Sequence, residues 1–132
     1  ILARVRGDGG ALALASTRLH LAEAAHGMKS NETALKFCRL ALETLSPSAL
    51  DAVRRDSLRA EIRVGIVVQH ARAAGLLCQL APDDATGEEH ARNAAQNLVA
   101  VKALPGIDRR VLDSIDRAEF DLTRVSHRVA ET

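Results

Sequence analysis

Residues 11–45 read ALALASTRLHLAEAAHGMKSNETALKFCRLALETL, and this stretch decides the fold class. Apolar side chains recur in it at every seventh residue, namely Leu14, Leu21, Met28, Leu35 and Leu42. Three residues after each of them stands a second set, Thr17, Ala24, Asn31, Cys38 and Leu45. This is the spacing of a long amphipathic helix that buries one stripe of side chains against a neighbour. The sequence therefore predicts helices packed on helices.

The composition of the whole chain favours the same class. Its 132 residues include 24 alanines and 15 arginines, which favour helix, and only two aromatic residues, Phe37 and Phe120. The length is that of one domain with a core of its own. We expect an all-α protein, either an antiparallel helical bundle or a helical-hairpin repeat, with about four main helices.

Glycine and proline indicate where the helices end. Three glycines fall within residues 7–10, so residues 1–10 are predicted to be a flexible N-terminal segment and 11–132 a single helical domain. Helices are expected over 11–45, 49–80, 88–104 and 108–130, with Pro47 ending the first one. Gly27 and Asn31 offer an alternative break, but the heptad spacing runs through it and favours one continuous helix.

Charge and hydrophobicity exclude several kinds of partner. The net charge of +1 argues against nucleic acid bound through counterion release, and the absence of Trp and Tyr removes the usual platforms for stacking bases. No apolar run approaches the roughly 20 residues that span a bilayer, and no leader segment is recognisable. Cys38 and Cys78 lie in apolar helical stretches and are expected to be buried free thiols in a reducing compartment, which favours a cytoplasmic protein.

One short motif suggests chemistry. His26 is followed three residues later by Lys29, a pattern that resembles the phosphoacceptor segment of histidine phosphotransfer domains. With Ser30-Asn31 it is also similar to the dimerisation helices of one group of sensor kinases. The resemblance implies a role in signal transduction, with His26 as the phosphoacceptor and Lys29 as the residue that helps to hold the phosphoryl group.

A second resemblance covers residues 15–65. Ala22, Ala34 and Ala41 are spaced by 12 and then 7 residues, and Pro47 follows. This pattern is similar to tetratricopeptide-like repeats, in which small residues stand where two helices cross closely. The resemblance requires a break near Gly27, and it implies a concave groove that binds a peptide or a partner helix.

No motif of a catalytic or cofactor-binding site occurs. The sequence has no P-loop, no dinucleotide-binding turn, no Cys-x-x-Cys pair and no nucleophile elbow, so we expect neither a cofactor nor a metal site. The function that the sequence favours is a non-catalytic module for interaction with a protein partner or for self-association as a dimer. Its expected interface is a stripe on the first helix opposite Met28, with Leu12, Leu19 and Leu40.

Overall fold

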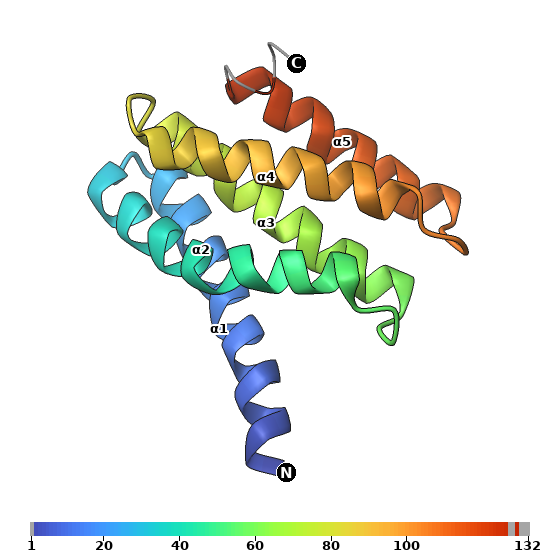
Figure 1. Ribbon diagram of the computed structural model, residues 1–132. Helices are drawn as coiled ribbons and strands as arrows, with labels where there is room; N and C mark the ends of the chain where they lie inside the picture. The colour runs from blue at the N-terminus through green and yellow to red at the C-terminus, as the bar shows by residue number, and fades with distance from the viewer. Residues whose placement is uncertain (1, 127–128, 130–132) are drawn as a thin grey trace.

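The computed structural model describes residues 2–126 and residue 129. In this part of the chain five α-helices form and no strand does (Figure 1). They are α1 (Leu2–Gly27), α2 (Asn31–Arg54), α3 (Ala60–Leu80), α4 (Ala85–Lys102) and α5 (Arg109–Val125). The all-α class is confirmed, with one helix more than expected. Because α1 begins at Leu2, it includes the glycines at positions 7–10 that the sequence assigned to a flexible segment.

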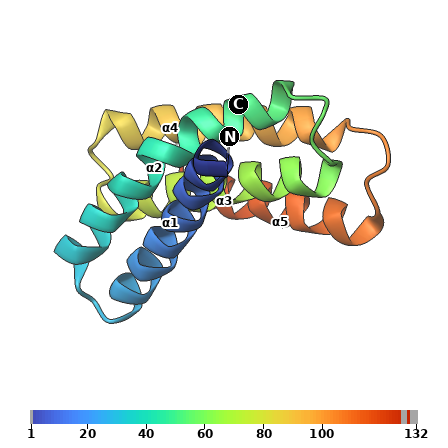
Figure 2. The same cartoon turned by 90° about the horizontal axis from the view of Figure 1, so that it is seen from below.

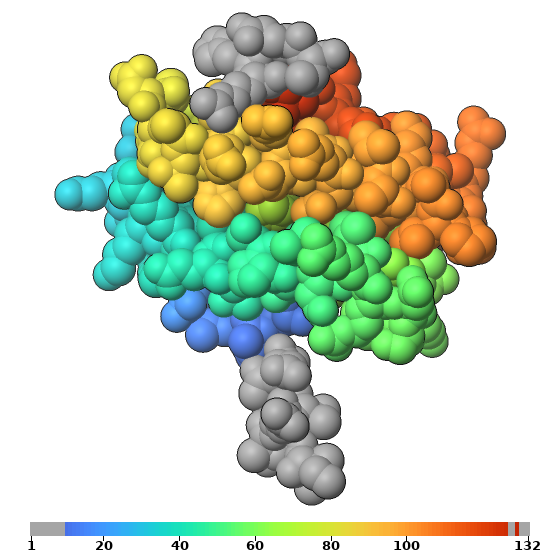
Figure 3. Space-filling model, viewed as in Figure 1, coloured from blue at the N-terminus to red at the C-terminus, as the bar shows by residue number. Residues whose placement is uncertain are grey.

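The helices form two layers. Figure 2 shows α2 and α4 on one side, and α1, α3 and α5 on the other. The α3 helix is central and contacts all four others, whereas α1 contacts neither α4 nor α5. In the space-filling view of Figure 3, which has the orientation of Figure 1, α2 and α4 cover most of α3. The short connections between consecutive helices make each an antiparallel neighbour of the next.

The expected continuous helix over 11–45 is wrong, because the chain turns at residues 28–30. Lys29 takes a left-handed conformation with φ of 62°. The Ser30 amide then donates to the Ala25 carbonyl over 2.8 Å, a hydrogen bond typical of a helix C-terminus that ends in a left-handed residue. The helix break between Gly27 and Asn31, which the sequence favoured less than a continuous helix, is the one that forms.

The expected helix end at Pro47 is also wrong, since α2 runs through this residue to Arg54. Pro47 itself is exposed. Residues on both sides of it lie on one buried face of α2, namely Leu42, Leu45, Ala49 and Ala52. The packing of this face outweighs the cost of about 3 kcal/mol that a proline brings to a helix interior.

A buried arginine closes the turn between α2 and α3. Arg63 is only 6% exposed. Its Nε donates to the Ala52 carbonyl over 2.7 Å, and a second guanidinium nitrogen donates to the Val53 carbonyl over 2.6 Å. These carbonyls belong to the last turn of α2, where no amide of the helix can reach them. Arg63, on α3, thus satisfies two carbonyls at the end of α2.

The buried side of α1 is not the heptad stripe. Leu14 and Leu21 are 48% and 45% exposed and Met28 is 81% exposed, whereas Ala15, Leu19 and Ala22 are buried. The small alanine side chains let α2 approach α1 closely, and they decide which face turns inward. The leucine stripe therefore predicted the wrong buried face of α1, because many of the buried residues of this protein are alanines.

The core has two parts that share α3. One part joins α1, α2 and α3 around Leu19, Leu45 and Leu77. The other joins α3, α4 and α5, with the end of α2, around Val67, Leu98 and Ile115. The α3 helix therefore supplies side chains to both parts of the core.

Candidate functional site

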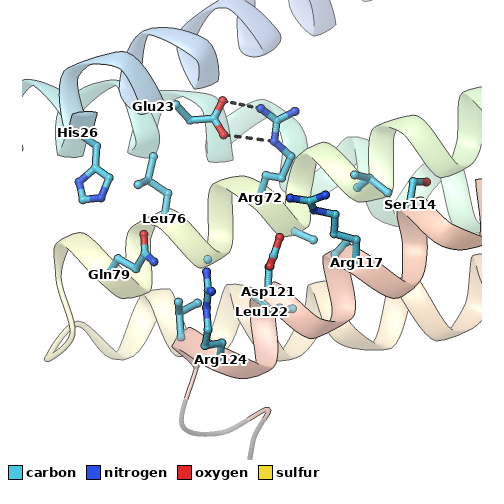
Figure 4. A pocket seen from close by; sticks show the side chains of 15 residues that line it. Glu23, His26, Arg72, Leu76, Gln79, Ser114, Arg117, Asp121, Leu122 and Arg124 are labelled. Carbon is cyan, nitrogen blue, oxygen red and sulfur yellow. Dashed lines mark hydrogen bonds and ion pairs between the residues drawn. The ribbon is translucent and has the colours of Figure 1, made fainter. Parts of the chain in front are cut away.

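A groove of about 520 Å³ lies on the layer of α1, α3 and α5. The α3 helix forms its floor, the last turns of α1 form one wall and α5 forms the other (Figure 4). Its lining comprises Glu23, His26, Val68, Ala71, Arg72, Gly75, Leu76, Gln79, Ser114, Arg117, Ala118, Asp121, Leu122, Arg124 and Val125. The groove exists because α1 and α5 flank α3 without touching each other.

The floor of the groove has an apolar strip, with Arg72 and Gln79 of α3 beside it. On α3, Val68, Ala71 and Gly75 recur at intervals of three and four residues, which is the spacing of one helix face, and Leu76 follows Gly75 directly. Leu122 on α5 continues this surface. Ala71, Leu76 and Leu122 are buried at the base of the groove, whereas Val68 and Gly75 are half-buried. None of these side chains carries a polar atom, so this strip favours contact with an apolar surface.

An ion pair spans the groove between α1 and α3. Arg72 donates from Nε to one Glu23 carboxylate oxygen over 3.2 Å and from a terminal nitrogen to the other oxygen, so the pair is bidentate (Figure 4). Both side chains are partly exposed. This pair ties the end of α1 to α3, where the two helices otherwise touch little, and it leaves the Arg72 charge neutralised.

The α5 wall carries charges without such partners. Arg117, Asp121 and Arg124 are exposed, and none of them forms an ion pair or hydrogen bond with another described side chain. Figure 4 shows them projecting from α5 beside the groove. With the Glu23–Arg72 pair neutral, this rim has two cations and one anion. Sequence reasoning missed these residues, because only the fold brings α5 next to residues 68–79.

The structure places His26 on the groove wall and separates it from Lys29. His26 is exposed in the last turn of α1 and points toward the groove (Figure 4). Lys29 is exposed in the turn that follows the helix. The two residues therefore do not lie on one helix face. The resemblance to phosphotransfer domains implies that they would.

Of the three leucines expected at an interface, Leu19 is buried and Leu12 and Leu40 are half-buried. Leu19 is 1% exposed in the core shared by α1, α2 and α3, and Leu12 packs against the same core. Leu40 is half-buried on α2. The expectation of an exposed stripe is thus wrong for Leu19, because this face of α1 turns toward α2 and α3.

Two histidines meet in the core between α3 and α4. The ring centroids of His70 and His90 are 5.9 Å apart, and the rings are nearly perpendicular. His70 is fully buried, and neither of its ring nitrogens has a hydrogen-bond partner among the described residues. Burial, with a smaller contribution from His90, lowers the pKa of His70 to about 4. Burial also lowers the pKa of His90. His70 is therefore neutral at pH 7.

A smaller hollow of about 340 Å³ lies beside His90, on the side of α2 and α4. The ion pair between Arg39 and Asp84, 3.1 Å long, is part of its lining. Asp84 also caps α4 by accepting from the Thr86 amide over 2.9 Å. These interactions stabilise the charged form of Asp84 and so lower its pKa. The hydrogen bonds with Thr86 contribute most to this shift. Its polar groups are thus already used in holding α4 against α2.

Within residues 2–126 and 129, no three His, Cys, Asp or Glu side chains are placed to hold a metal ion. Cys38 and Cys78 are both buried and free, as expected. Burial raises the pKa of Cys38 to about 12 and that of Cys78 to about 11, which keeps both as unreactive thiols.

Comparison of the chain with models of protein families, with curated proteins and with solved structures finds no match. No helix in the described ranges combines the length and the hydrophobicity needed to cross a membrane.

Proposed function

We infer that the groove between α1, α3 and α5 is a docking site for another protein, and that the chain acts as a non-catalytic interaction module. The observation that carries this proposal is a groove with apolar side chains along its floor, between two walls with charged side chains. Binding sites between helices combine apolar area with a few polar groups that fix the orientation of the ligand. Recognition of a protein segment needs these two features and no reactive group.

The cellular setting of this module is proposed to be the cytoplasm. Two buried free thiols support a reducing compartment. The partner is either a different protein or a second copy of the chain, and the groove suits both, because its walls belong to one molecule and need no residue from another.

Photo-crosslinking tests the docking site directly. A benzophenone attached at position 79 sits at the end of the groove, because Gln79 is exposed and part of its lining. A label at position 92 is the control, because Arg92 is exposed on α4 and outside the lining. We expect the label at position 79 to form a discrete adduct with the bound partner, and the label at position 92 to form none. The mass of the adduct distinguishes a second copy from another protein.

A pair of glycines on α3 provides matched variants for this experiment. A side chain at Gly75 enters the groove, and its Cβ meets only ordinary contacts, 3.5 Å from Val125 Cγ2 and 3.8 Å from Leu122 Cδ1. Gly65 is exposed, with nothing within 4 Å of a new Cβ. Gly75→Leu should abolish the adduct and Gly65→Leu should preserve it. An adduct that survives Gly75→Leu would show that the partner binds elsewhere.

Phosphotransfer through His26 is a second proposal, supported by the exposure of this side chain. The position of Lys29 outside the helix supports it less. It predicts an acid-labile phosphate that forms with a kinase and is lost in His26→Gln. A His26→Gln variant that is phosphorylated like the wild type would end this proposal.

A further inference from the structure

The floor of the groove restricts the conformation that a bound segment can take. The floor is made of side chains, and the backbone amides of α3 and α5 are engaged within these helices. An extended segment would have to leave its own N–H and C=O groups unpaired over this apolar surface, which is costly. A helix pairs its backbone groups internally and presents only side chains. The floor therefore favours a helix.

The dimensions of the groove agree with a short helix. Its α3 side runs from Val68 to Gln79, which is about 16 Å at the helical rise of about 1.5 Å per residue. This length corresponds to three turns of a bound helix. A helix lying along this groove of about 520 Å³ would face α3 with one side and water with the opposite side.

The α5 rim adds a charge pattern. Arg117 and Arg124 are seven residues apart, about 10.5 Å along the axis or two helical turns. On a bound helix that runs alongside α5, two side chains seven residues apart have the same axial separation as Arg117 and Arg124, and they point to the same side of that helix. Asp121 stands between the arginines and disfavours an acidic residue in the middle of the partner. Glu23 contributes no opposing charge, because Arg72 neutralises it.

From these observations the geometry points to one class of occupant: an amphipathic helix of a partner protein with an apolar face, two acidic residues seven apart beside it, and a non-acidic residue between them. This inference rests on the proposed docking function of the groove. The acidic residues contact Arg117 and Arg124, and the apolar face covers the α3 floor.

A designed peptide tests the inference without knowledge of the natural partner. The probe is a fluorescein-labelled peptide of about 18 residues, long enough to form helix, with leucines on one face and two glutamates seven apart beside them. One control peptide has both glutamates replaced by lysine, and a second has two central prolines that prevent a helix. Binding to the intact chain is measured by fluorescence anisotropy, and helix formation by circular dichroism.

The wild type should bind the acidic helix most tightly. Two partly exposed charge pairs predict that replacing both glutamates weakens binding about tenfold. The double variant Arg117→Glu, Arg124→Glu should reverse the preference and bind the lysine peptide better. The matched double variant Arg109→Glu, Arg110→Glu changes two exposed arginines of α5 outside the groove lining and should keep the wild-type preference.

The outcomes separate this inference from the proposed function. Equal binding of the proline peptide, or a preference unchanged by Arg117→Glu, Arg124→Glu, would overturn the helical acidic occupant. The same holds if the acidic peptide fails to bind. If any of these results comes with the Gln79 crosslink intact, the docking site stands and only its ligand class is wrong. Loss of the crosslink specificity would end both.

Discussion

The stability of this protein should fall in mild acid because of one buried histidine. The His70 pKa is about 4 in the folded chain against 6.5 for an ordinary histidine, so the unfolded chain binds a proton first as the pH falls. The folded state is then progressively disfavoured between about pH 6.5 and pH 4. The gap corresponds to about 3 kcal/mol of unfolding free energy, at about 1.4 kcal/mol for each pH unit.

Replacement of His70 by leucine removes this titration. Urea unfolding followed by circular dichroism at a series of pH values gives the free energy for the wild type and for His70→Leu. We expect the wild type to lose about 3 kcal/mol more than the variant between pH 6.5 and pH 4. At pH 7 the variant should be no less stable, because leucine removes two ring nitrogens that lack hydrogen-bond partners among the described residues.

The exposed histidine His20 supplies the control. His20→Gln removes one imidazole from the surface and should keep the acid sensitivity of the wild type. Parallel pH profiles for the wild type and His70→Leu would refute the reasoning, because they would mean that His70 charges as easily in the folded chain as in the unfolded one.

Four further predictions follow from contacts in the core and at the surface. Arg63→Met should lower the unfolding free energy by about 2–4 kcal/mol in urea titrations, since two carbonyls of α2 lose charge-assisted hydrogen bonds in a buried place; a loss below 1 kcal/mol would contradict this role. Leu77→Ala should cost about 3–5 kcal/mol, because Leu77 is 1% exposed in the core; a well-tolerated variant would mean that the site collapses. Glu23→Gln should change the unfolding free energy by less than about 1 kcal/mol, because its ion pair is partly exposed; a larger effect would show that this pair, more than packing, holds α1 on α3. Cys38 and Cys78 should resist thiol reagents in the folded chain and react after denaturation; rapid labelling of the native protein would contradict their burial.

The fold class could be predicted from the sequence because alanine and arginine are local signals for helix. The face that α1 turns toward the core could not be predicted, because the heptad of leucines competes with Ala15 and Ala22, which are completely buried. A close approach between two helices is decided by the shapes of both of them. Leu14 and Leu21, large and apolar, are left outside for this reason.

The ends of the helices were predicted with mixed success, and the reasons differ. Glycine and asparagine near residue 27 gave a correct local signal that the longer heptad pattern overrode. At Pro47 the local signal was misleading, because the tertiary packing of Leu45 and Ala49 holds the helix together on both sides. The turn after α2 depends on Arg63, whose role as a cap is visible only when α3 folds back.

The groove was beyond sequence reasoning, although one signal could have suggested it. His26 was singled out for its spacing to Lys29, and it does line the groove. The small and apolar positions 68, 71 and 75 fall on one face of α3, but nothing in the sequence shows that no helix covers this face. Arg117 and Arg124 become part of the site only through the packing of α5 on α3.

The central claim, that the α1, α3 and α5 groove is the docking surface, is tested most directly by amide chemical-shift mapping of the ¹⁵N-labelled chain with the acidic helical peptide. We predict that the shifts change along residues 68–79 and 114–125 and near His26, while the exposed face of α4 around Val99 stays unchanged. Changes centred on α4, or spread evenly over the molecule, would contradict the account.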